Sequence, residues 1–275
     1  MLHTEIRGQG DQTLVFIPGL GGTTRYWRSR LGHLNDRHRV VLVDLLGFGQ
    51  SPKPWTRYSV ERHVSELHQV LEPLAPVSLV GHSLGALLTV AYAARYPDQV
   101  KSIILLGMPY FGSQRNAYNY FRRGPIWGGF LFTNIVLTTV TCIMTRRLFG
   151  RILPYLLRRH VSREVAEDLV LHTWRSSTSS LWEVVYRYDT AHDLQNLPAR
   201  IVVLLIHGDQ DVMAPVTKVK ALAANHADWR LRVLPNVDHH PFLRRPGICR
   251  TLFEQSLAQS GSKPGSSNAF RQIVD

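Results

Sequence analysis

The feature that most constrains this chain is a series of short apolar runs, each about as long as one β-strand. The runs are rich in valine, isoleucine and leucine and do not alternate with polar residues. Strands with that pattern are buried on both faces, which is typical of a parallel sheet covered by helices on each side. Five strong runs and one weaker run occupy residues 13–17, 40–44, 77–80, 102–106, 201–206 and 231–234.

Helical patterns fill the intervals between these runs. The clearest covers residues 59–74, where Ser59 is placed to cap the helix and Glu61 and Arg62 occupy its first turn. Another, over residues 246–258, is expected to close the domain. Alternating strands and helices predict an α/β fold with a mostly parallel, doubly wound sheet.

The alternation stops between the fourth and fifth runs. About ninety residues pass there without a strand signal, which is too many for one crossover connection. An inserted helical subdomain explains the interval. The predicted domains are a core of residues 1–108 and 199–260, a helical cap of residues 109–198, and a flexible tail of residues 261–275 that is rich in glycine and serine.

One stretch inside the predicted cap, residues 124–145, contains no charged residue and has arginine pairs on both sides. Its length is close to that of a membrane-spanning helix. Pro125, a double glycine, Asn134 and five threonines lower its apolarity. Three interpretations stay open: an apolar cap that lines a substrate pocket, which we favour, a contact with the membrane interface, and a true span.

The composition excludes several classes of protein. An apolar content of 44% and a charged content of 19% are those of an ordinary globular domain. The two cysteines, Cys142 and Cys249, stand in no metal-ligand spacing, which argues against a disulfide framework and a structural zinc site. The first ten residues lack the pattern of a signal peptide, so we expect a cytoplasmic location.

The formal net charge of +12 calls for a separate explanation. A basic surface attracts nucleic acid, anionic lipid or acidic substrates. No RNP-like, zinc-finger or basic-zipper pattern accompanies the charge. We therefore expect a generally basic surface and no nucleic-acid partner, and weak association with an anionic membrane stays open. Composition does not indicate the oligomeric state.

The segment Gly81-His82-Ser83-Leu84-Gly85 joins the third apolar run to a helical pattern. The chain must reverse there within about one turn, and glycines on both sides leave room for a strained turn. Ser83 would then stand at the apex with its hydroxyl exposed, which is the arrangement of a nucleophile elbow. The alternative is that Ser83 only caps the helix.

A nucleophilic serine needs a base and an acid that orients the base. In hydrolases with a G-x-S-x-G elbow, the acid and then the histidine follow the serine along the chain. The turn after the fifth run offers Asp209 and Asp211, and the loop after the last run offers His239 and His240. The order fits a triad, but it leaves the choice within each pair open.

Five motifs in this order resemble those of the α/β-hydrolase superfamily, in particular its cap-bearing esterases, lactonases and carbon–carbon hydrolases. The resemblance covers nearly all of residues 12–258, although the cap shares only position and general character. It implies an α/β-hydrolase fold with an inserted helical cap. The motifs are IPGLGG at 17–22, DLLGFGQS at 44–51, GHSLGA at 81–86, GDQDVMAP at 208–215 and HHPFLRRP at 239–246.

The resemblance also implies which acid and which base belong to the site. The family's G-x-x-D-x-x-x-P pattern makes Asp211 the acid and leaves Asp209 as a turn residue. The family's H-x-P-x-L-x-x-P segment, counted back from Pro246, makes His239 the base. His240 then occupies a position that is usually aromatic.

The family stabilises the oxyanion with two backbone N–H groups, which the resemblance places at Leu20 and Leu84. The sequence departs from the family at the first of these, because Pro18-Gly19 stands where a His-Gly pair is commoner. The donor is a backbone group and survives that change. His82 is expected to pack under the elbow.

The resemblance implies a serine hydrolase that cleaves a carboxylic ester with a hydrophobic acyl or alcohol part. The reaction would proceed through the Ser-His-Asp triad and an acyl-enzyme, with no metal or cofactor. Ser83 excludes the relatives with an aspartate nucleophile, which are haloalkane dehalogenases and epoxide hydrolases. Two rivals stay open: an acyltransferase or carbon–carbon hydrolase of the same fold, and a non-catalytic binding protein built on a hydrolase shell.

The pocket is the least determined part of the site. Aromatic residues of the predicted cap could line it, and arginines there could meet an acidic substrate or an anionic lipid surface, although a plain surface role is favoured for each arginine. The candidate pocket residues are Trp127, Phe130, Phe132, Trp174, Trp182 and His240, and the arginines are Arg122, Arg123, Arg146 and Arg147.

Overall fold

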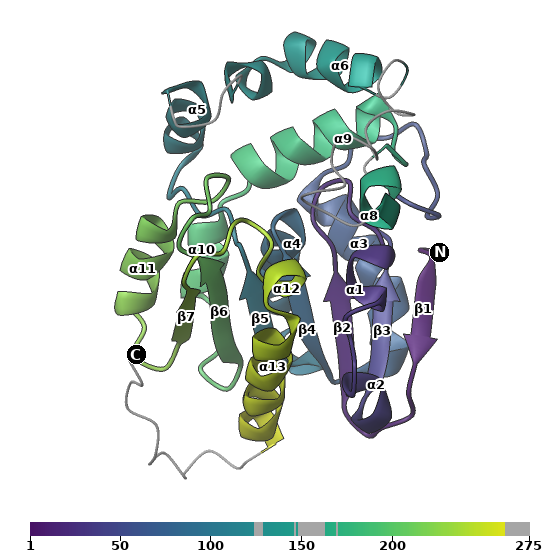
Figure 1. Cartoon of the computed structure of the whole chain (residues 1–275), viewed down its shortest axis with the longest axis vertical. Helices are drawn as coiled ribbons and strands as arrows, with labels where there is room; N and C mark the ends of the chain where they lie inside the picture. Colours follow the sequence, from purple (N-terminus) through teal and green to yellow (C-terminus); the bar gives the residue numbers. More distant parts are fainter. Residues whose placement is uncertain (124–128, 146, 148–162, 169, 262–275) are drawn as a thin grey trace.

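A computed structural model describes residues 1–123, 129–145, 147, 163–168 and 170–261. Its strands form one sheet in the order β1-β3-β2-β4-β5-β6-β7 (Figure 1). Among the described strands, β1 runs antiparallel to β3 and every other neighbouring pair is parallel. The predicted fold class is therefore confirmed. The strands are β1 Thr4–Arg7, β2 Thr13–Ile17, β3 Arg39–Val43, β4 Val77–His82, β5 Val100–Leu106, β6 Val202–Gly208 and β7 Arg230–Leu234.

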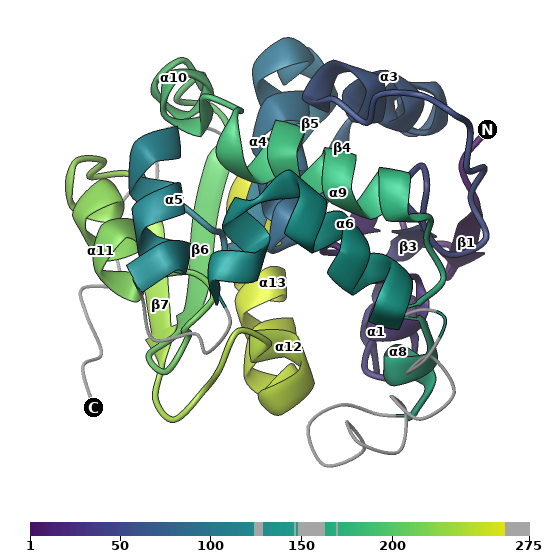
Figure 2. The ribbon, with the colours of Figure 1, turned by 90° about the horizontal axis from the view of Figure 1, so that it is seen from above.

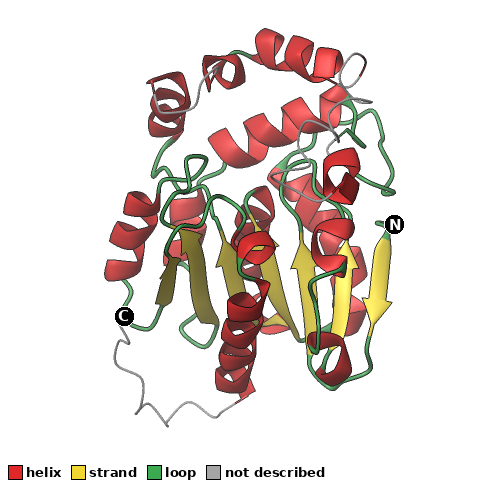
Figure 3. Ribbon diagram, in the orientation of Figure 1, coloured by secondary structure: helices red, strands yellow, loops and turns green. Residues whose placement is uncertain are grey.

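Helices cover both faces of the sheet, as the continuous apolar strands require (Figure 3). Val15 and Ile17 of β2 point to one face and belong to a core shared with α3, α4, α10 and α11. Leu14 and Phe16 point to the other face and pack with α1, α2, α12 and α13. The helices are α1 Arg25–Arg28, α2 Leu34–Arg37, α3 Val60–Leu71, α4 Leu84–Arg95, α10 Thr190–Gln195, α11 Val216–Ala224, α12 Pro241–Arg244 and α13 Pro246–Gly261.

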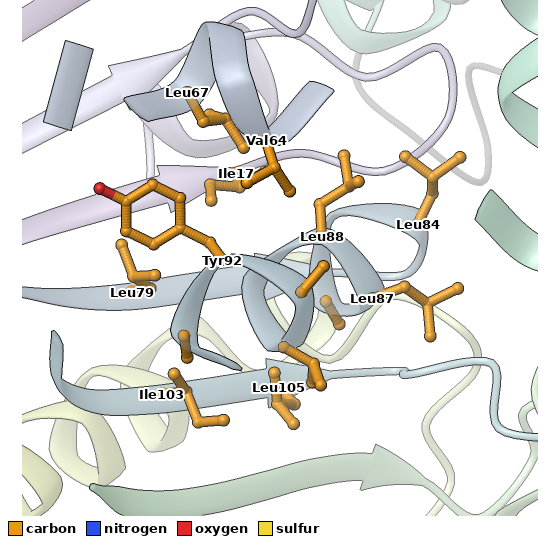
Figure 4. Packing of buried hydrophobic residues seen from close by; sticks show 14 of the residues in the cluster. Ile17, Val64, Leu67, Leu79, Leu84, Leu87, Leu88, Tyr92, Ile103 and Leu105 are labelled. Atoms are coloured by element: carbon orange, nitrogen blue, oxygen red, sulfur yellow. The ribbon is translucent and has the colours of Figure 1, made fainter. Parts of the chain in front are cut away.

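The first core lies between β4, β5 and the helices α3 and α4 (Figure 4). Leu88 and Tyr92 of α4 are fully buried there, as are Leu79 of β4 and Ile103 of β5. Because α4 follows directly after Ser83, this packing fixes the position of the elbow relative to the sheet.

The helix predicted over residues 59–74 divides into two parts. Ser59 caps α3, since its Oγ accepts a hydrogen bond of 3.2 Å from the Arg62 N–H. The α-helix ends at Leu71, and a short 3₁₀ helix, η1, covers Glu72–Leu74. Pro73 explains the change, because proline has no N–H to donate and its ring obstructs a continuing α-helix.

Strand β1 was missed by the sequence prediction. Its four residues, TEIR, contain a single apolar side chain, Ile6, which is 58% exposed. A strand at the edge of a sheet with one solvated face gives no continuous apolar run. Its pairing with β3 is set by the sheet and is not signalled locally.

Residues between β5 and β6 form a helical layer above the carboxyl ends of the parallel strands (Figures 1 and 2). The last helix of the interval, α10, instead packs against α4 beside the sheet, so the cap boundaries at 109 and 198 stay a prediction. The predicted tail from residue 262 onward lies outside the described residues. The elements are α5 Gln114–Arg123, η3 Gly129–Thr133, α6 Ile135–Met144, α8 Arg163–Asp168, α9 Trp174–Ser180 and a π-helical turn, η5, Leu181–Tyr186.

The apolar stretch at 124–145 is described only from residue 129 onward. Its regular helix, α6, is ten residues long. Within the described parts of the chain, no helix has both the length and the apolarity needed to cross a membrane.

Candidate active site

Ser83 stands at the turn between β4 and α4 in a backbone conformation that a non-glycine residue rarely adopts. Its φ is 52° and its ψ is −120°, and its N–H donates to the Leu106 carbonyl at 2.9 Å. The glycine at position 85 is required by close packing, because a Cβ there would lie 2.4 Å from the carbonyl oxygens of Ile17 and Pro18. The tight turn exposes the serine hydroxyl above the sheet.

The structure brings Ser83, His239 and Asp211 together from three separate strand ends. The Ser83 hydroxyl lies 2.8 Å from His239 Nε2, and His239 Nδ1 lies 2.8 Å from Asp211 Oδ2. His239 belongs to the loop after β7, and Asp211 to the turn after β6. These are the contacts that a nucleophile, a general base and an orienting acid require. Of the adjacent histidines, it is His239 that makes them.

The Asp211 carboxylate is buried and held by several hydrogen bonds. Its Oδ1 accepts the N–H groups of Met213 and Ala214, both at 2.8 Å. Burial raises the pKa of Asp211, but hydrogen bonds from His207 and His239 oppose burial and hold that pKa well below its ordinary value. The group is therefore an anion near neutral pH, facing the Nδ1–H of His239.

His207 is a residue of this site that the sequence analysis did not single out. Its Nε2–H donates to the Ala214 carbonyl at 2.8 Å and lies 3.2 Å from Asp211 Oδ2. The side chain is buried within β6. The sequence did contain a signal for it, because His207 is a polar residue that directly follows the apolar run IVVLLI at 201–206.

His82 and His240 lie beside His239 but do not contact Ser83 or Asp211 through hydrogen bonds of the kind that His239 makes. The His82 Nε2–H donates to the His239 carbonyl at 2.8 Å, and the ring stacks on Tyr26. Burial lowers the pKa of His82 well below its ordinary value and lowers that of His240 to about 4. Both rings are therefore neutral near pH 7, and His82 holds the backbone of His239 in place.

The loop after β2 lies directly against the elbow. A Cβ on Gly19 would lie 3.1 Å from both Ser83 Cβ and His82 Nδ1, so a larger residue there would push these neighbours by a few tenths of an ångström. Leu20 and Leu84, whose N–H groups are the candidate oxyanion donors, both line the cavity beside Ser83.

Asp44 ties the DLLGFGQS turn to the chain that follows this loop. Its Oδ1 accepts the Thr24 N–H at 2.7 Å and its Oδ2 accepts the Gln50 N–H at 2.8 Å. The contact with Thr24 anchors the far end of the loop after β2, whereas Pro18, which stands where the family commonly has a histidine, lies at the near end.

A cavity of about 360 Å³ opens at Ser83. Its walls are mostly apolar, and Leu181 and Val185 of η5 cover it from above the sheet. The lining residues are Gly19, Leu20, Gly22, Tyr26, His82, Ser83, Leu84, Pro109, Leu181, Val185, Met213, His239 and His240.

Of the predicted pocket residues that the structure describes, only His240 lines this cavity. Trp182 does not line the cavity and packs with Phe121 and Tyr186 in a cluster that also contains the lining residue Leu181. Trp174 stands edge-on to Trp55 at 5.9 Å between ring centroids, Phe130 is 54% exposed, and Phe132 packs beside the Trp182 cluster.

The other candidates are equally remote or undescribed. Arg122, Arg123 and Arg147 are exposed and do not line the cavity. Trp127 and Arg146 lie outside the described residues. Within the described residues, no group of three or more histidine, cysteine or acidic side chains is placed to hold a metal ion.

Comparison with known proteins agrees with this geometry. The family model for the α/β-hydrolase fold matches residues 12–246. The chain belongs to the α/β-hydrolase family. The resemblance inferred from the five motifs is therefore confirmed.

Several members of the family are similar to this α/β hydrolase. "Probable lysophospholipase BODYGUARD 1" of Arabidopsis thaliana is 26% identical over 261 residues, which cover 84% of this chain and 55% of that protein. The chain thus spans about half the length of the curated relatives that it matches first.

Solved structures share the fold. A bromoperoxidase from Bacillus anthracis superposes with a TM-score of 0.76 at 22% identity, covering 94% of this chain and 95% of that one. The enol-lactonase from Burkholderia xenovorans LB400 gives a TM-score of 0.74 at 22% identity, covering 94% and 96%. At these identities the likeness establishes the fold alone.

Proposed function

We propose that this α/β hydrolase is a serine hydrolase that cleaves a carboxylic ester with a hydrophobic acyl or alcohol part. One observation carries the proposal: the linked contacts of Ser83, His239 and Asp211 at the wall of an apolar cavity. A hydroxyl, an imidazole and a buried carboxylate linked in that order supply the nucleophile, the general base and the orienting acid that acyl transfer to serine requires.

The geometry supports a specific movement of protons. His239 Nε2 takes the proton of the Ser83 hydroxyl as the oxygen attacks the ester carbonyl. Asp211 accepts the hydrogen bond from Nδ1, which fixes the tautomer and stabilises the imidazolium. His239 then gives the proton to the leaving alcohol, and the acyl group stays on Ser83 as an ester.

The second half of the reaction repeats these steps with water. His239 removes a proton from water, the hydroxide attacks the acyl-enzyme, and the carboxylic acid leaves as Ser83 regains its proton. In both halves we assign the backbone N–H groups of Leu20 and Leu84 to the oxyanion. The loss of one such donor typically lowers the rate by about 10²–10³.

The cavity supports an apolar substrate. Leu20, Leu181, Val185 and Met213 contribute apolar walls, and none of the described lining residues is an arginine or a lysine. The similar protein of Arabidopsis thaliana is named a probable lysophospholipase, which agrees with an ester substrate that has an apolar part. We assign residues 109–198 the role of a cap over this cavity. A cytoplasmic location stays a prediction.

The test is hydrolysis of p-nitrophenyl esters from acetate to palmitate by the wild-type protein and by Ser83→Ala. We expect turnover that disappears in the variant, with an optimum chain length set by the cavity. Fluorophosphonate labelling of wild type but not of Ser83→Ala would support the same nucleophile independently.

Two outcomes would redirect the assignment. Labelling of Ser83 without ester turnover would favour an acyltransferase or a carbon–carbon hydrolase, to be tested with a second acceptor or a vinylogous diketone. Neither labelling nor turnover in a folded protein would favour a non-catalytic binding protein.

A further inference from the structure

Helix α6 is the outermost of the described helices above the sheet (Figures 1 and 2), and several of its apolar side chains are exposed to solvent. Val136 is 65% exposed, Val140 51%, Met144 44% and Leu137 39%. At about 100° per residue these four side chains share one side of the helix. We call them the α6 apolar face.

The opposite side of α6, which packs on the protein, is polar. Thr138 is buried, and its hydroxyl donates to a carbonyl of η3 at 2.7 Å. Thr139 Oγ1 lies 3.5 Å from Thr178 Oγ1 of α9, and Cys142 Sγ lies 3.2 Å from His172 Nε2. The helix therefore has the reverse of the amphipathicity of a helix that covers a core in water.

A contiguous exposed apolar surface marks an interaction site in a folded protein. Among the described residues, large apolar side chains with high exposure are concentrated in this part of the chain: besides the α6 apolar face, Phe130 of η3 and Ile135 at the start of α6 are more than half exposed. Isolated exposed residues elsewhere, such as Ile248 of α13, have no such neighbours within their element.

The charge of the surrounding sequence indicates what would cover this face. Between Pro109 and Arg163 the chain contains nine arginines and neither aspartate nor glutamate, so this segment holds most of the excess charge of +12. The basic character is therefore local rather than general. The arginines are Arg115, Arg122, Arg123, Arg146, Arg147, Arg151, Arg158, Arg159 and Arg163.

Three of these arginines lie in described segments that flank α6 along the chain. Arg122 and Arg123 are exposed at the end of α5, which packs against η3, and η3 in turn contacts α6. Arg147 is exposed three residues beyond the end of α6. Apolar side chains bordered by arginines suit the boundary between lipid headgroups and acyl chains.

We propose that the α6 apolar face and its neighbouring arginines dock the protein on a bilayer that contains anionic lipid. A second copy of the chain is a poorer occupant, since a symmetric contact would bring arginine-rich segments together without acidic partners. Docking goes beyond the proposed ester hydrolysis. It would also hold the layer that covers the cavity against a source of apolar esters.

Both parts of the surface contribute to the expected affinity. Each arginine close to an anionic membrane strengthens partitioning about fivefold. Insertion of the valine side chains strengthens it by at least about tenfold. The electrostatic part weakens as salt shortens the screening length.

The experiment is vesicle flotation of the full chain at low and high salt. One set of vesicles contains phosphatidylcholine and phosphatidylserine, and the other contains phosphatidylcholine alone. We expect binding to the first set, with little binding to the second. V136N/V140N is expected to bind at least about tenfold more weakly, and R122Q/R123Q about 25-fold more weakly.

Matched variants on other surfaces control for general effects. I6N/I248N removes two exposed apolar side chains, and R39Q/R230Q removes two exposed arginines, all four distant in sequence from α6. Both controls should bind like wild type, and thermal unfolding checks that every variant is folded. Ser83→Ala should also bind like wild type, so a failure of the hydrolase assignment leaves this test intact.

Three results would overturn the proposal. One is no flotation with phosphatidylserine vesicles, and another is unchanged flotation of V136N/V140N. The third is a dimer in sedimentation that V136N/V140N dissociates, which would assign the face to self-association instead.

Discussion

Replacement of Asp211 by asparagine tests the proposed triad most sharply, because it changes one oxygen into a donor with almost no change in shape. Asp211 Oδ1 faces two N–H donors, from Met213 and Ala214, and Oδ2 faces donors on His239 and His207. The asparagine oxygen will take the Oδ1 place, because an NH₂ group there would meet two backbone donors. The NH₂ group must then point at His239.

The consequence is the wrong tautomer of the base. His239 Nδ1 becomes an acceptor for the asparagine, so the ring proton moves to Nε2, which faces Ser83 at 2.8 Å. A protonated Nε2 cannot remove the serine proton. The rate loss for this change in a serine triad is about 10⁴-fold, or about 5.5 kcal/mol of activation free energy. The lost charge-assisted hydrogen bond is worth about 1.5–3 kcal/mol of stability.

The assay is kcat/KM on the best p-nitrophenyl ester, with urea unfolding measured in parallel. Asp209→Asn is the matched control, because Asp209 is exposed, lies two residues away and accepts a hydrogen bond of 3.3 Å from the Val237 N–H. It should keep most of the activity. A loss of less than tenfold in Asp211→Asn would refute the tautomer argument, and a greater loss in Asp209→Asn would move the acid to that residue.

Two further changes test the packing and the buried charges. Gly85→Ala should destabilise the protein by about 1–3 kcal/mol, despite the better helix propensity of alanine, because its Cβ meets the Ile17 and Pro18 carbonyls at 2.4 Å. The control is Gly247→Ala in α13, where an added Cβ meets nothing within 4 Å. This variant is expected to raise the free energy of unfolding by about 0.5–1 kcal/mol. Equal thermal midpoints for the two variants would contradict the steric explanation. Burial lowers the pKa of His63 to about 4 in the folded protein, whereas in the unfolded chain it is about 6.5. Between these two pH values the unfolded state binds a proton that the folded state does not. The free energy of unfolding therefore falls as pH falls through this window, by up to about 3 kcal/mol. Urea unfolding of His63→Gln at pH 7 and pH 4 should show a correspondingly smaller fall, and an equal fall would show that His63 is not responsible.

Most strands of the sheet could be predicted from the sequence, because a parallel strand buried on both faces consists of a continuous run of apolar residues. The run at 13–17 matches β2, and the remaining runs match their strands to within about two residues at each end. The turn at Ser83 could also be predicted from the sequence, because so tight a turn requires glycine where position 85 approaches the carbonyl oxygens of Ile17 and Pro18. The edge strand β1 could not, because its pairing depends on β3 and not on its own residues.

The pocket shows the limit of sequence reasoning most clearly. Trp182 was a candidate as a large aromatic residue of the predicted cap, but it packs with Tyr186 and does not line the cavity at Ser83. Leu181 and Val185, four residues apart in the same π-helical turn, η5, line the cavity instead. The rotation of a helical segment about its axis depends on what packs against it, and no local pattern encodes that choice.

The sequence by itself determined the family, the fold class and the residue types from which a site could be assembled, because strand burial, tight turns and motif order are properties of short segments. The tertiary structure decided which of those residues meet. It brought Asp211 and His239 to Ser83 across the sheet, enclosed the Asp211 carboxylate with His207, and turned the polar side of α6 inward and its valines outward. Contacts of this kind depend on distances between segments far apart in the chain, and only the folded protein sets those distances.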